Sequence, residues 1–319
     1  MNYPKSRLRR LRYNKNIRTL VQDVQLNISD LIYPIFICEG INIKEEIKSL
    51  PGQYRLSVDN VLVLCDELIK LGIKSILLFG ISDKKDNDGS IACSEDSIIP
   101  FAIKKIKNKF RNDILVMADL CNCSYTSHGH CGTIENNDVD NDVTLINIAK
   151  QVVSHARAGA DMVAPSGMID GTIQMVREAL DNNGFVNLPI MAYSVKYASA
   201  FYGPFRDAAD SAPSFGDRRT YQMNPSNRDA AIREANFDDQ EGADILMVKP
   251  ALSYLDIIRD LKNDFDRPIA CYNVSGEYAM IKAASEKGWI DGDRVMMESL
   301  LSMKRAGASI IITYFAKEA

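Results

Sequence analysis

Three cysteines and two histidines fall within one fourteen-residue segment, DLCNCSYTSHGHCG, at residues 119–132. Cys121, Cys123 and Cys131 have the spacing C-x-C-x7-C, which differs from the paired CxxC of structural zinc ribbons. Thiolates are good zinc ligands, and His128 or His130 could supply the fourth ligand of a closed structural site. A catalytic site would instead use three protein ligands and leave one position open. Residue types and spacing alone allow both kinds of site.

Two lysines occupy positions where an ammonium group is costly. Lys249 lies inside the apolar run MVKPA, and Lys196 ends the run YSVK. Burial and a second nearby cation both lower the pKa of a lysine, so that its neutral amine can attack a carbonyl and form a Schiff base. A single strand-end lysine more often reaches solvent or pairs with a carboxylate. Two on neighbouring strands favour carbonyl chemistry on one or two keto substrates.

The segment after Lys196, residues 197–225, is rich in glycine, proline, serine and aromatic residues and shows little helical period. This composition predicts a long loop, and long loops at the mouth of an enzyme usually form lids or binding loops. Arg206, Arg218 and Arg219 could bind a substrate carboxylate through their guanidinium groups. The alternative for each arginine is a surface ion pair with Asp207, Asp210 or Asp217.

Eight short apolar runs predict the strands that position these residues. They are residues 31–37, 75–81, 114–120, 162–168, 189–195, 245–251, 268–274 and 309–315. Their near-continuous hydrophobicity is typical of strands buried on both faces. Amphipathic helical patterns separate them, and four of these patterns end in a glycine just before the next strand: Gly72, Gly159, Gly242 and Gly307.

Eight βα units in 319 residues predict an α/β fold, a (β/α)8 barrel. A doubly wound open sheet is the alternative, but no GxGxxG follows an early strand. We predict an N-terminal arm over residues 1–25 and a single barrel domain over residues 26–319, with a lid at about 197–225.

Barrel enzymes place their active sites at the C-terminal ends of the strands. Reactive residue types cluster at the ends of six consecutive predicted strands: Asp119 with the cysteines, Ser166 with Asp170, Lys196, Lys249, Ser275 and Tyr314. This shared location favours an open, catalytic zinc site over a closed structural one. It also suggests that Asp119, beside the cysteines, assists proton transfer.

Overall composition limits the class of protein. A net charge of −4 and a pI near 5.6 argue against a general nucleic-acid binder. We expect a cytoplasmic protein with no membrane partner, because no apolar run is long enough to span a bilayer and no secretory signal is evident. Seven cysteines without a regular framework fit a reducing compartment. The basic first twenty residues predict an ordered or partner-contacting arm, with a frayed tail or a transit peptide as alternatives.

Taken together, the chain resembles the porphobilinogen synthases, also called 5-aminolevulinate dehydratases, over essentially its whole length. The resemblance rests on long motifs in the same order: RLRRLR, DLCNCSYTSHGHCG, APSGMIDG, YSVKYASAFYGPFRDAADSAP, GDRRTYQMNP, MVKPALSYLDI, VSGEYAMI and KRAGASIIITYFA. It implies a lyase that condenses two molecules of 5-aminolevulinate to porphobilinogen, with loss of two waters, in tetrapyrrole (haem) biosynthesis.

The same resemblance implies roles for individual residues. Lys249 and Lys196 match the two Schiff-base lysines, and Lys249 takes the substrate that becomes the propionate side of the product. The implied contacts to the two substrate carboxylates are Arg206 and Arg219 on the acetate side, and Ser275 and Tyr314 on the propionate side. The lid varies in length among members, so Arg218 and Arg219 could exchange roles.

The resemblance also implies metals and partners. Cys121, Cys123 and Cys131 match the ligands of a catalytic Zn²⁺ in the zinc-dependent branch, and Glu234 matches a ligand of an allosteric Mg²⁺. Family members usually form homo-octamers in which N-terminal arms embrace neighbours. Two other functions remain open at this point. A class I aldolase-like barrel explains neither the second lysine nor the three thiolates, and a non-catalytic zinc-stabilised barrel would hold its zinc through four protein ligands.

Overall fold

Eight parallel strands form the barrel, and the computed structural model describes residues 2–319 of the chain. The strands are β1 (Leu31–Cys38), β4 (Ser75–Ile81), β5 (Leu115–Leu120), β8 (Met162–Pro165), β9 (Met191–Lys196), β10 (Ile245–Lys249), β11 (Ile269–Asn273) and β12 (Ile310–Thr313). They pair in the order β8-β5-β4-β1-β12-β11-β10-β9, and a parallel bridge between Val163 and Ile190 joins the two ends. The predicted barrel is therefore confirmed, and each of the eight apolar runs overlaps one strand, with β1 and β9 each extending one residue further.

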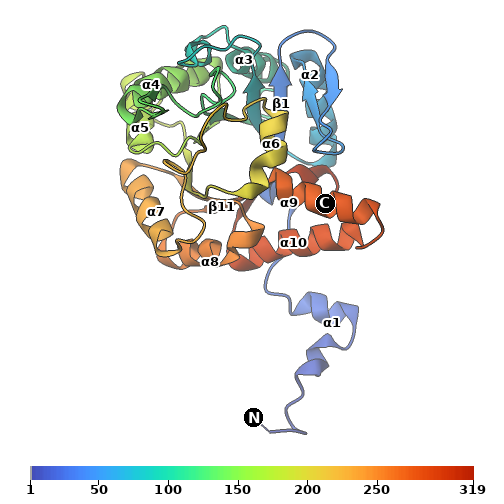
Figure 1. Cartoon of the computed structure of the whole chain (residues 1–319). Helices are drawn as coiled ribbons and strands as arrows, with labels where there is room; N and C mark the ends of the chain where they lie inside the picture. The colour runs from blue at the N-terminus through green and yellow to red at the C-terminus, as the bar shows by residue number, and fades with distance from the viewer. Residues whose placement is uncertain (1) are drawn as a thin grey trace.

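An outer layer of helices surrounds the strands (Figure 1). It consists of α2 (Val58–Leu71), α3 (Ile98–Phe110), α4 (Asn141–Ala158), α5 (Thr172–Asn182), α7 (Asp229–Glu241), α8 (Leu255–Asp264), α9 (Ser275–Glu286) and α10 (Gly292–Ala306). Gly72, Gly159, Gly242 and Gly307 each follow a helix with φ between 88° and 128°. A side chain is strained at such φ values, so glycine both ends the helix and turns the chain into the next strand.

Short strands and 3-10 turns follow several barrel strands at the C-terminal rim of the barrel. An antiparallel pair, β2 (Lys44–Glu46) and β3 (Tyr54–Leu56), follows β1, and a second pair, β6 (Ile134–Glu135) and β7 (Asp138–Val139), follows the cysteine loop. The 3-10 turns η3 (Ser90–Cys93), η5 (Leu252–Tyr254) and η6 (Tyr314–Lys317) follow β4, β10 and β12.

The lid is more regular than its composition predicts. It begins with the turn η4 (Ala200–Tyr202) and the short helix α6 (Gly203–Ala208), before an irregular stretch that runs to α7. Pro204 lies in the first turn of α6, where its missing N–H would have no partner in any case. This helix fixes the direction of Arg206, which a featureless loop would not.

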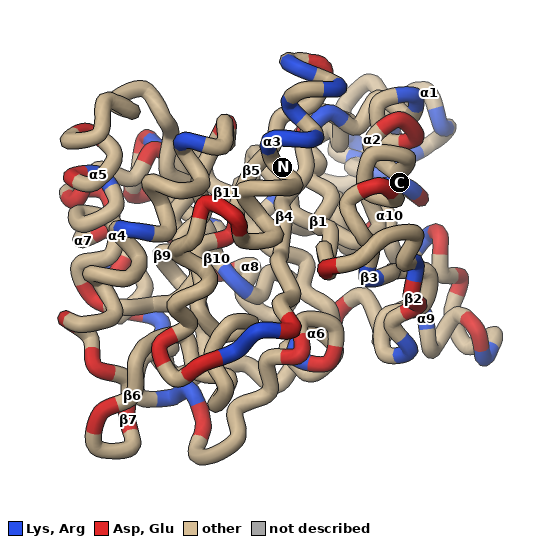
Figure 2. Tube along the Cα trace, turned by 90° about the horizontal axis from the view of Figure 1, so that it is seen from above, with Lys and Arg blue, Asp and Glu red and all other residues tan. Residues whose placement is uncertain are grey.

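The N-terminal arm projects away from the barrel (Figure 1). It carries η1 (Leu8–Arg12) and α1 (Lys15–Leu20), while η2 (Ile28–Asp30) leads into β1; residue 1 lies outside the described residues. Figure 2 shows basic positions along the arm, whereas both signs of charge are spread over the barrel helices. Large apolar side chains of the arm are exposed: Tyr3, Leu8, Leu11, Tyr13 and Leu20. Within residues 2–319, we find no helix that is both long and apolar enough to cross a bilayer.

Candidate active site

The two predicted lysines lie side by side at the ends of neighbouring strands. Lys196 on β9 and Lys249 on β10 are register partners, and their side chains are 5% and 4% exposed. The Lys249 Nζ atom lies between 4.3 and 5.4 Å from the ring centroids of four aromatic residues, Tyr193, Tyr202, Phe205 and Tyr272. Burial, and then the charge of Lys196, lower the pKa of Lys249 well below its usual value. The geometry therefore favours a neutral, nucleophilic amine.

A bulge in β9 turns both lysines toward the same cavity. Leu246 pairs with Ala192 and Lys249 with Lys196, so three steps along β10 match four steps along β9. The ring of Tyr193 lies 5.0 Å from Lys249 Nζ and 5.7 Å from Lys196 Nζ, although Tyr193 and Lys196 are an odd number of residues apart. In a regular strand that spacing would place their side chains on opposite faces. The sequence analysis placed the lysines on adjacent strands but did not detect this bulge.

Asp119 lies next to the last residue of β5 and faces the lysines. Its Oδ1 atom is buried without a hydrogen-bond partner among the described residues. Burial raises the pKa of Asp119 to about 7, against the opposing effects of the Ser166 hydroxyl and the two lysines. A carboxyl group in this setting can both donate and accept a proton near neutral pH.

A small cavity joins these groups to the cysteine loop. Its volume is about 20 Å³, and its lining includes Lys196, Lys249, Asp119, Cys121, Cys123 and Arg218. Such a space holds roughly one water molecule. A substrate can therefore enter only when the lid moves.

The three predicted thiol ligands converge beside this cavity. The Sγ atoms of Cys121, Cys123 and Cys131 lie within 4.8 Å of one another, and all three residues are buried. Hydrogen bonds from the thiols of Cys121 and Cys123 hold the pKa of Cys131 well below its usual value. Three thiols that share a negative charge at this spacing form a donor set suited to Zn²⁺.

Neither histidine of the loop joins the thiols. The Nε2 atom of His128 lies 2.9 Å from the carbonyl of Asn87. The two ring nitrogens of His130 lie 3.1 Å from the Tyr221 hydroxyl and 3.0 Å from the carbonyl of Phe215. Both imidazoles are thus engaged in holding the loop to its surroundings. This arrangement favours a three-ligand metal site over a closed four-ligand one.

The structure brings two of the three lid arginines to the site. Arg218 is 5% exposed, and its Nη2 atom donates to the carbonyls of Gly129 and Ser211, each at 2.7 Å. Arg206 on α6 is half-buried, and burial together with the charge of Arg218 lowers the pKa of Arg206. The side chain of Arg219 is 79% exposed and pairs with Asp217. The predicted substrate contact of Arg219 therefore finds no support in its position.

Gln222 is a buried polar residue of the lid that the sequence does not single out. Gln222 is 3% exposed, and both polar atoms of its side chain lack a hydrogen-bond partner among the described residues. The same holds for the Nε atoms of Arg206 and Arg218. Unpaired buried polar groups are costly, so the Nε atoms of Arg206 and Arg218 mark a place for a polar ligand. Gln222 marks a second place, in the pocket that it lines with Asp170 and Glu234. A lone glutamine in a lid carries no sequence signal of such a role.

Ser275 and Tyr314 lie at the ends of β11 and β12, each 1% exposed. The Ser275 Oγ atom accepts a hydrogen bond from Phe205 N in the lid, at 3.0 Å. The hydroxyl of Tyr314 lies 3.1 Å from that of Tyr272, whose ring also flanks Lys249. Both predicted residues are thus placed on the Lys249 side of the barrel mouth.

Comparison with known proteins agrees with this geometry. The family model described as delta-aminolevulinic acid dehydratase matches residues 5–319. The chain belongs to this dehydratase family. The delta-aminolevulinic acid dehydratase of Halalkalibacterium halodurans is 54% identical over 312 residues, which cover 98% of this chain and 95% of that protein. That of Bacillus subtilis is 52% identical over 314 residues, covering 98% and 97%.

A solved relative extends the comparison to three dimensions. The crystal structure of delta-aminolevulinic acid dehydratase (porphobilinogen synthase) from Toxoplasma gondii, in complex with the reaction product porphobilinogen, has a TM-score of 0.96 to this chain. The two are 45% identical, and the match covers 98% of this chain and 90% of that one. The resemblance seen in the sequence motifs is therefore confirmed at the level of the family and the fold.

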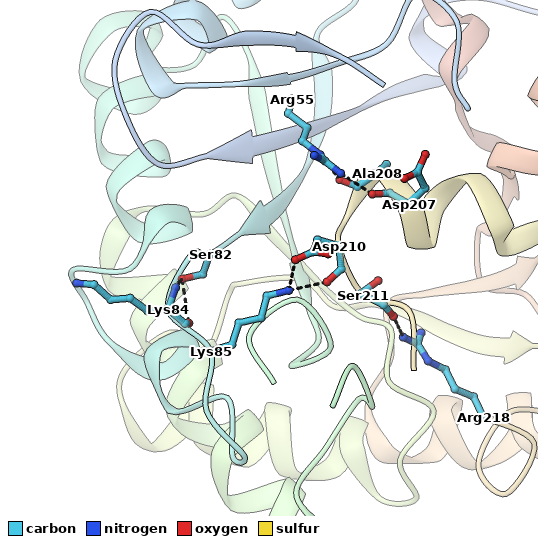
Figure 3. Close-up of polar contacts among 9 residues, drawn as sticks. All are labelled: Arg55, Ser82, Lys84, Lys85, Asp207, Ala208, Asp210, Ser211 and Arg218. Atoms are coloured by element: carbon cyan, nitrogen blue, oxygen red, sulfur yellow. Dashed lines mark hydrogen bonds and ion pairs between the residues drawn. The ribbon is translucent and has the colours of Figure 1, made fainter. Parts of the chain in front are cut away.

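The lid is held by two cations from the barrel rim, Arg55 and Lys85, and by one of its own, Arg218. Arg55 on β3 donates to the carbonyls of Ala208 and Asp207 at 2.8 and 2.6 Å, and Lys85 donates to the carbonyl of Asp210 at 2.6 Å. Arg218 donates to the carbonyl of Ser211 (Figure 3). We call Arg55 and Lys85 the lid clamp. Arg55 binds the last two residues of α6 and Lys85 binds Asp210 just after it, so the clamp fixes the end of the helix that carries Arg206.

Glu234 lies outside the barrel mouth, on α7. It is half-buried, and burial together with nearby Asp170 raises its pKa. It lines a pocket of about 380 Å³ with Asp170, Asp238 and Glu241. Within residues 2–319, the ligand atoms of Cys121, Cys123 and Cys131 lie close enough together to hold a metal ion, and Glu234 belongs to no such group. The assignment of Glu234 as a magnesium ligand stays a prediction.

Proposed function

We propose that the chain is a zinc-dependent porphobilinogen synthase that joins two molecules of 5-aminolevulinate into one porphobilinogen and releases two waters. Family membership supports this class of reaction, and the product bound to the Toxoplasma gondii relative supports the product. The register pairing of Lys196 with Lys249 carries the proposal, because two keto substrates require two amines within one cavity. This activity would be a lyase reaction of haem biosynthesis.

Each lysine activates one ketone. The neutral amine of Lys249 attacks the carbonyl carbon of one substrate, and loss of water from the adduct leaves an imine. Lys196 does the same with the second substrate. Imine formation withdraws electrons, so an adjacent C–H bond loses its proton more readily and the imine carbon accepts a new bond more readily. Burial, and then the charge of Lys196, favour the neutral amine of Lys249 for the first attack.

The substrate carboxylates need separate anchors. Ser275 and Tyr314, on the Lys249 side, are proposed to bind one carboxylate. Arg206 is proposed to bind the other. Arg218, buried beside Arg206, suits this role better than the exposed Arg219. A guanidinium pair is the usual protein partner of a carboxylate.

Asp119 is proposed as the proton carrier. Its unpaired Oδ1 atom lines the same cavity as both lysine side chains. Protons must leave carbon and reach departing oxygen within this closed space. A carboxyl group positioned there contributes typically 10²- to 10⁴-fold to the rate.

The donor set beside the cavity fits Zn²⁺. Cys121, Cys123 and Cys131 would hold it, since the loop histidines have other partners. When bound with an open position, zinc supplies a Lewis acid that polarises a carbonyl group or holds an amine. We also propose Glu234, with Asp170 nearby, as a Mg²⁺ ligand outside the active site, and a homo-octamer as the assembly.

A colorimetric assay for porphobilinogen tests the reaction. The protein should form product from 5-aminolevulinate, lose this activity with a zinc chelator, and regain it when zinc is added back. Product formation that is indifferent to the chelator would contradict the zinc assignment. Absence of product under every metal condition would contradict the proposed reaction itself.

Borohydride trapping tests the assignment of the lysines. Reduction in the presence of 5-aminolevulinate should add mass to the peptide that contains Lys249. Labelling only at other peptides would contradict its role.

Cys123→Ala separates a catalytic from a structural metal site. We expect the variant to lose activity and zinc while its circular dichroism and melting curve stay near those of the parent. Global unfolding would instead favour a metal that holds the fold together.

A further inference from the structure

Glu277, in the first turn of α9, is a fully buried acid. Among residues 2–319, it is the single aspartate or glutamate in the buried class, with 0% exposure. Its Oε1 atom accepts a hydrogen bond from Leu252 N at 2.7 Å, and its Oε2 atom accepts from Val274 N at 2.9 Å and Asn273 Nδ2 at 3.0 Å. These partners are all neutral. Burial of a carboxyl group without a cation costs folding free energy, which points to a specific structural role for Glu277.

The hydrogen bonds continue across the mouth of the barrel. The Oδ1 atom of Asn273 accepts from Thr313 Oγ1 at 2.9 Å, and that hydroxyl oxygen accepts from Phe315 N at 3.1 Å. Glu277, Asn273 and Thr313 are each 0% exposed. The chain of bonds therefore ties together the ends of β10, β11 and β12.

Each end of this network lies beside a proposed substrate contact. Leu252 follows Lys249 by three residues, Val274 directly precedes Ser275, and Phe315 directly follows Tyr314. The Lys196 side is different, because the amine of Lys196 donates to the Ser166 carbonyl and its own carbonyl accepts from Met223 N in the lid. One network thus holds the three elements of one substrate site and leaves the other site out.

We propose that Glu277 is a positioning residue that sets the distance between the Lys249 amine and the carboxylate anchors Ser275 and Tyr314. This inference rests on the proposed function. A substrate held at its ketone and at its carboxylate must match that distance, and a misplacement of about 1 Å in such a site can cost about a hundredfold in rate. Glu277 therefore selects a keto acid of one chain length at the Lys249 site. Its two oxygens make this possible because they accept hydrogen bonds from two different strand ends.

Glu277→Gln is the direct test, because it keeps the size of the side chain but places an NH₂ group against a facing donor. We expect the Michaelis constant for 5-aminolevulinate to rise at least about tenfold, as an unpaired buried donor forces the strand ends apart. Borohydride trapping should fall at the Lys249 peptide and persist at the Lys196 peptide. Adding Asn273→Asp should restore part of both losses, since the amide of one residue then meets the carboxylate of the other.

The control is Asp161→Asn. Asp161 also accepts from a strand amide, Val116 N at 2.8 Å, but at the opposite end of the barrel. It should lower the melting temperature without changing the Michaelis constant or the ratio of labelling at the two lysines. Equal losses of trapping at Lys196 and Lys249 in Glu277→Gln, or unfolding of that variant together with its double variant, would show a role in stability alone and overturn the inference. A parent protein that makes no porphobilinogen would contradict the proposed function. A parent that makes it, with a Glu277→Gln variant that loses trapping equally at both lysines, would contradict only the role of Glu277.

Discussion

At the scale of single residues, the burial that suits Lys249 to act as a nucleophile also lowers the stability of the fold. Its amine is buried and lies beside a second lysine, so the folded protein disfavours its charged form and lowers its pKa. The unfolded chain binds a proton there up to the usual pKa of 10.5, whereas the folded chain releases it at a lower pH. Between those two values the unfolded state holds more protons, so stability rises with pH and declines as pH falls toward the folded pKa.

Lys249→Met should therefore abolish activity and yet raise the melting temperature at neutral pH by a few degrees. The pH dependence of stability should become flatter below pH 10, because the group that causes it is gone. Thermal melts from pH 6 to 10 measure both effects. A variant less stable than the parent at pH 7 would contradict the idea that the amine is buried at a cost.

A second residue-scale prediction separates the two adjacent arginines of the lid. Arg218→Met should raise the Michaelis constant by about tenfold or more, since it removes a buried guanidinium beside Arg206. Arg219→Met is the matched control and should stay within about twofold of the parent, since its side chain is exposed and its ion pair is worth little. Steady-state kinetics on both variants decide the matter. The reverse pattern would support the assignment implied by the motif alone.

Residue types and their place at strand ends were enough to predict most of the site from the sequence. Lys196, Lys249, Asp119 and the three cysteines all come together at one barrel mouth. Two features could not be predicted in this way. Which of two adjacent arginines turns inward depends on the lid backbone, and Gln222 becomes notable only because its buried atoms lack partners.

At the scale of elements, the lid clamp predicts a measurable opening. Arg55→Ala together with Lys85→Ala removes three hydrogen bonds to lid carbonyls, and charged donors such as these contribute more than neutral ones. We expect the Michaelis constant to rise about five- to tenfold and trypsin to cut faster after Arg218 or Arg219. Arg228→Ala is the control, because it breaks the exposed pair with Asp260 away from the lid. Unchanged proteolysis in the double variant would exclude a role for the clamp in closure.

Element boundaries were predicted well where a glycine ends a helix, as at Gly72 and Gly242, because positive φ is a local requirement. The short helix α6 was not predicted. It has too few residues for a periodic pattern, and contacts with the rim, such as that of Phe205 with Ser275, stabilise it. Tertiary contacts of this kind leave no mark in a single sequence.

At the scale of the whole molecule, nothing within residues 2–319 covers the large apolar side chains of the arm. Leu8, Leu11, Tyr13 and Leu20 are between 56% and 84% exposed. Removal of residues 2–25 should therefore leave the barrel folded but reduce the size of the assembly. Light scattering and circular dichroism on the truncated protein measure the two properties separately. An assembly of unchanged mass would contradict the proposed role of the arm.

The bulge in β9 determines the face of the strand on which Lys196 lies. If the same residues of β9 ran in regular alternation without the bulge, Lys196 would lie on the face of Ala192, four residues before it, and would point outward into the helix layer while Lys249 stayed in the mouth. Such a barrel would retain one amine and could activate one ketone, which suffices for cleavage or aldol addition but not for joining two ketones on two lysines. The number of ketones that this barrel can activate is thus set by parity, through the bulge that brings Lys196 into register with Lys249.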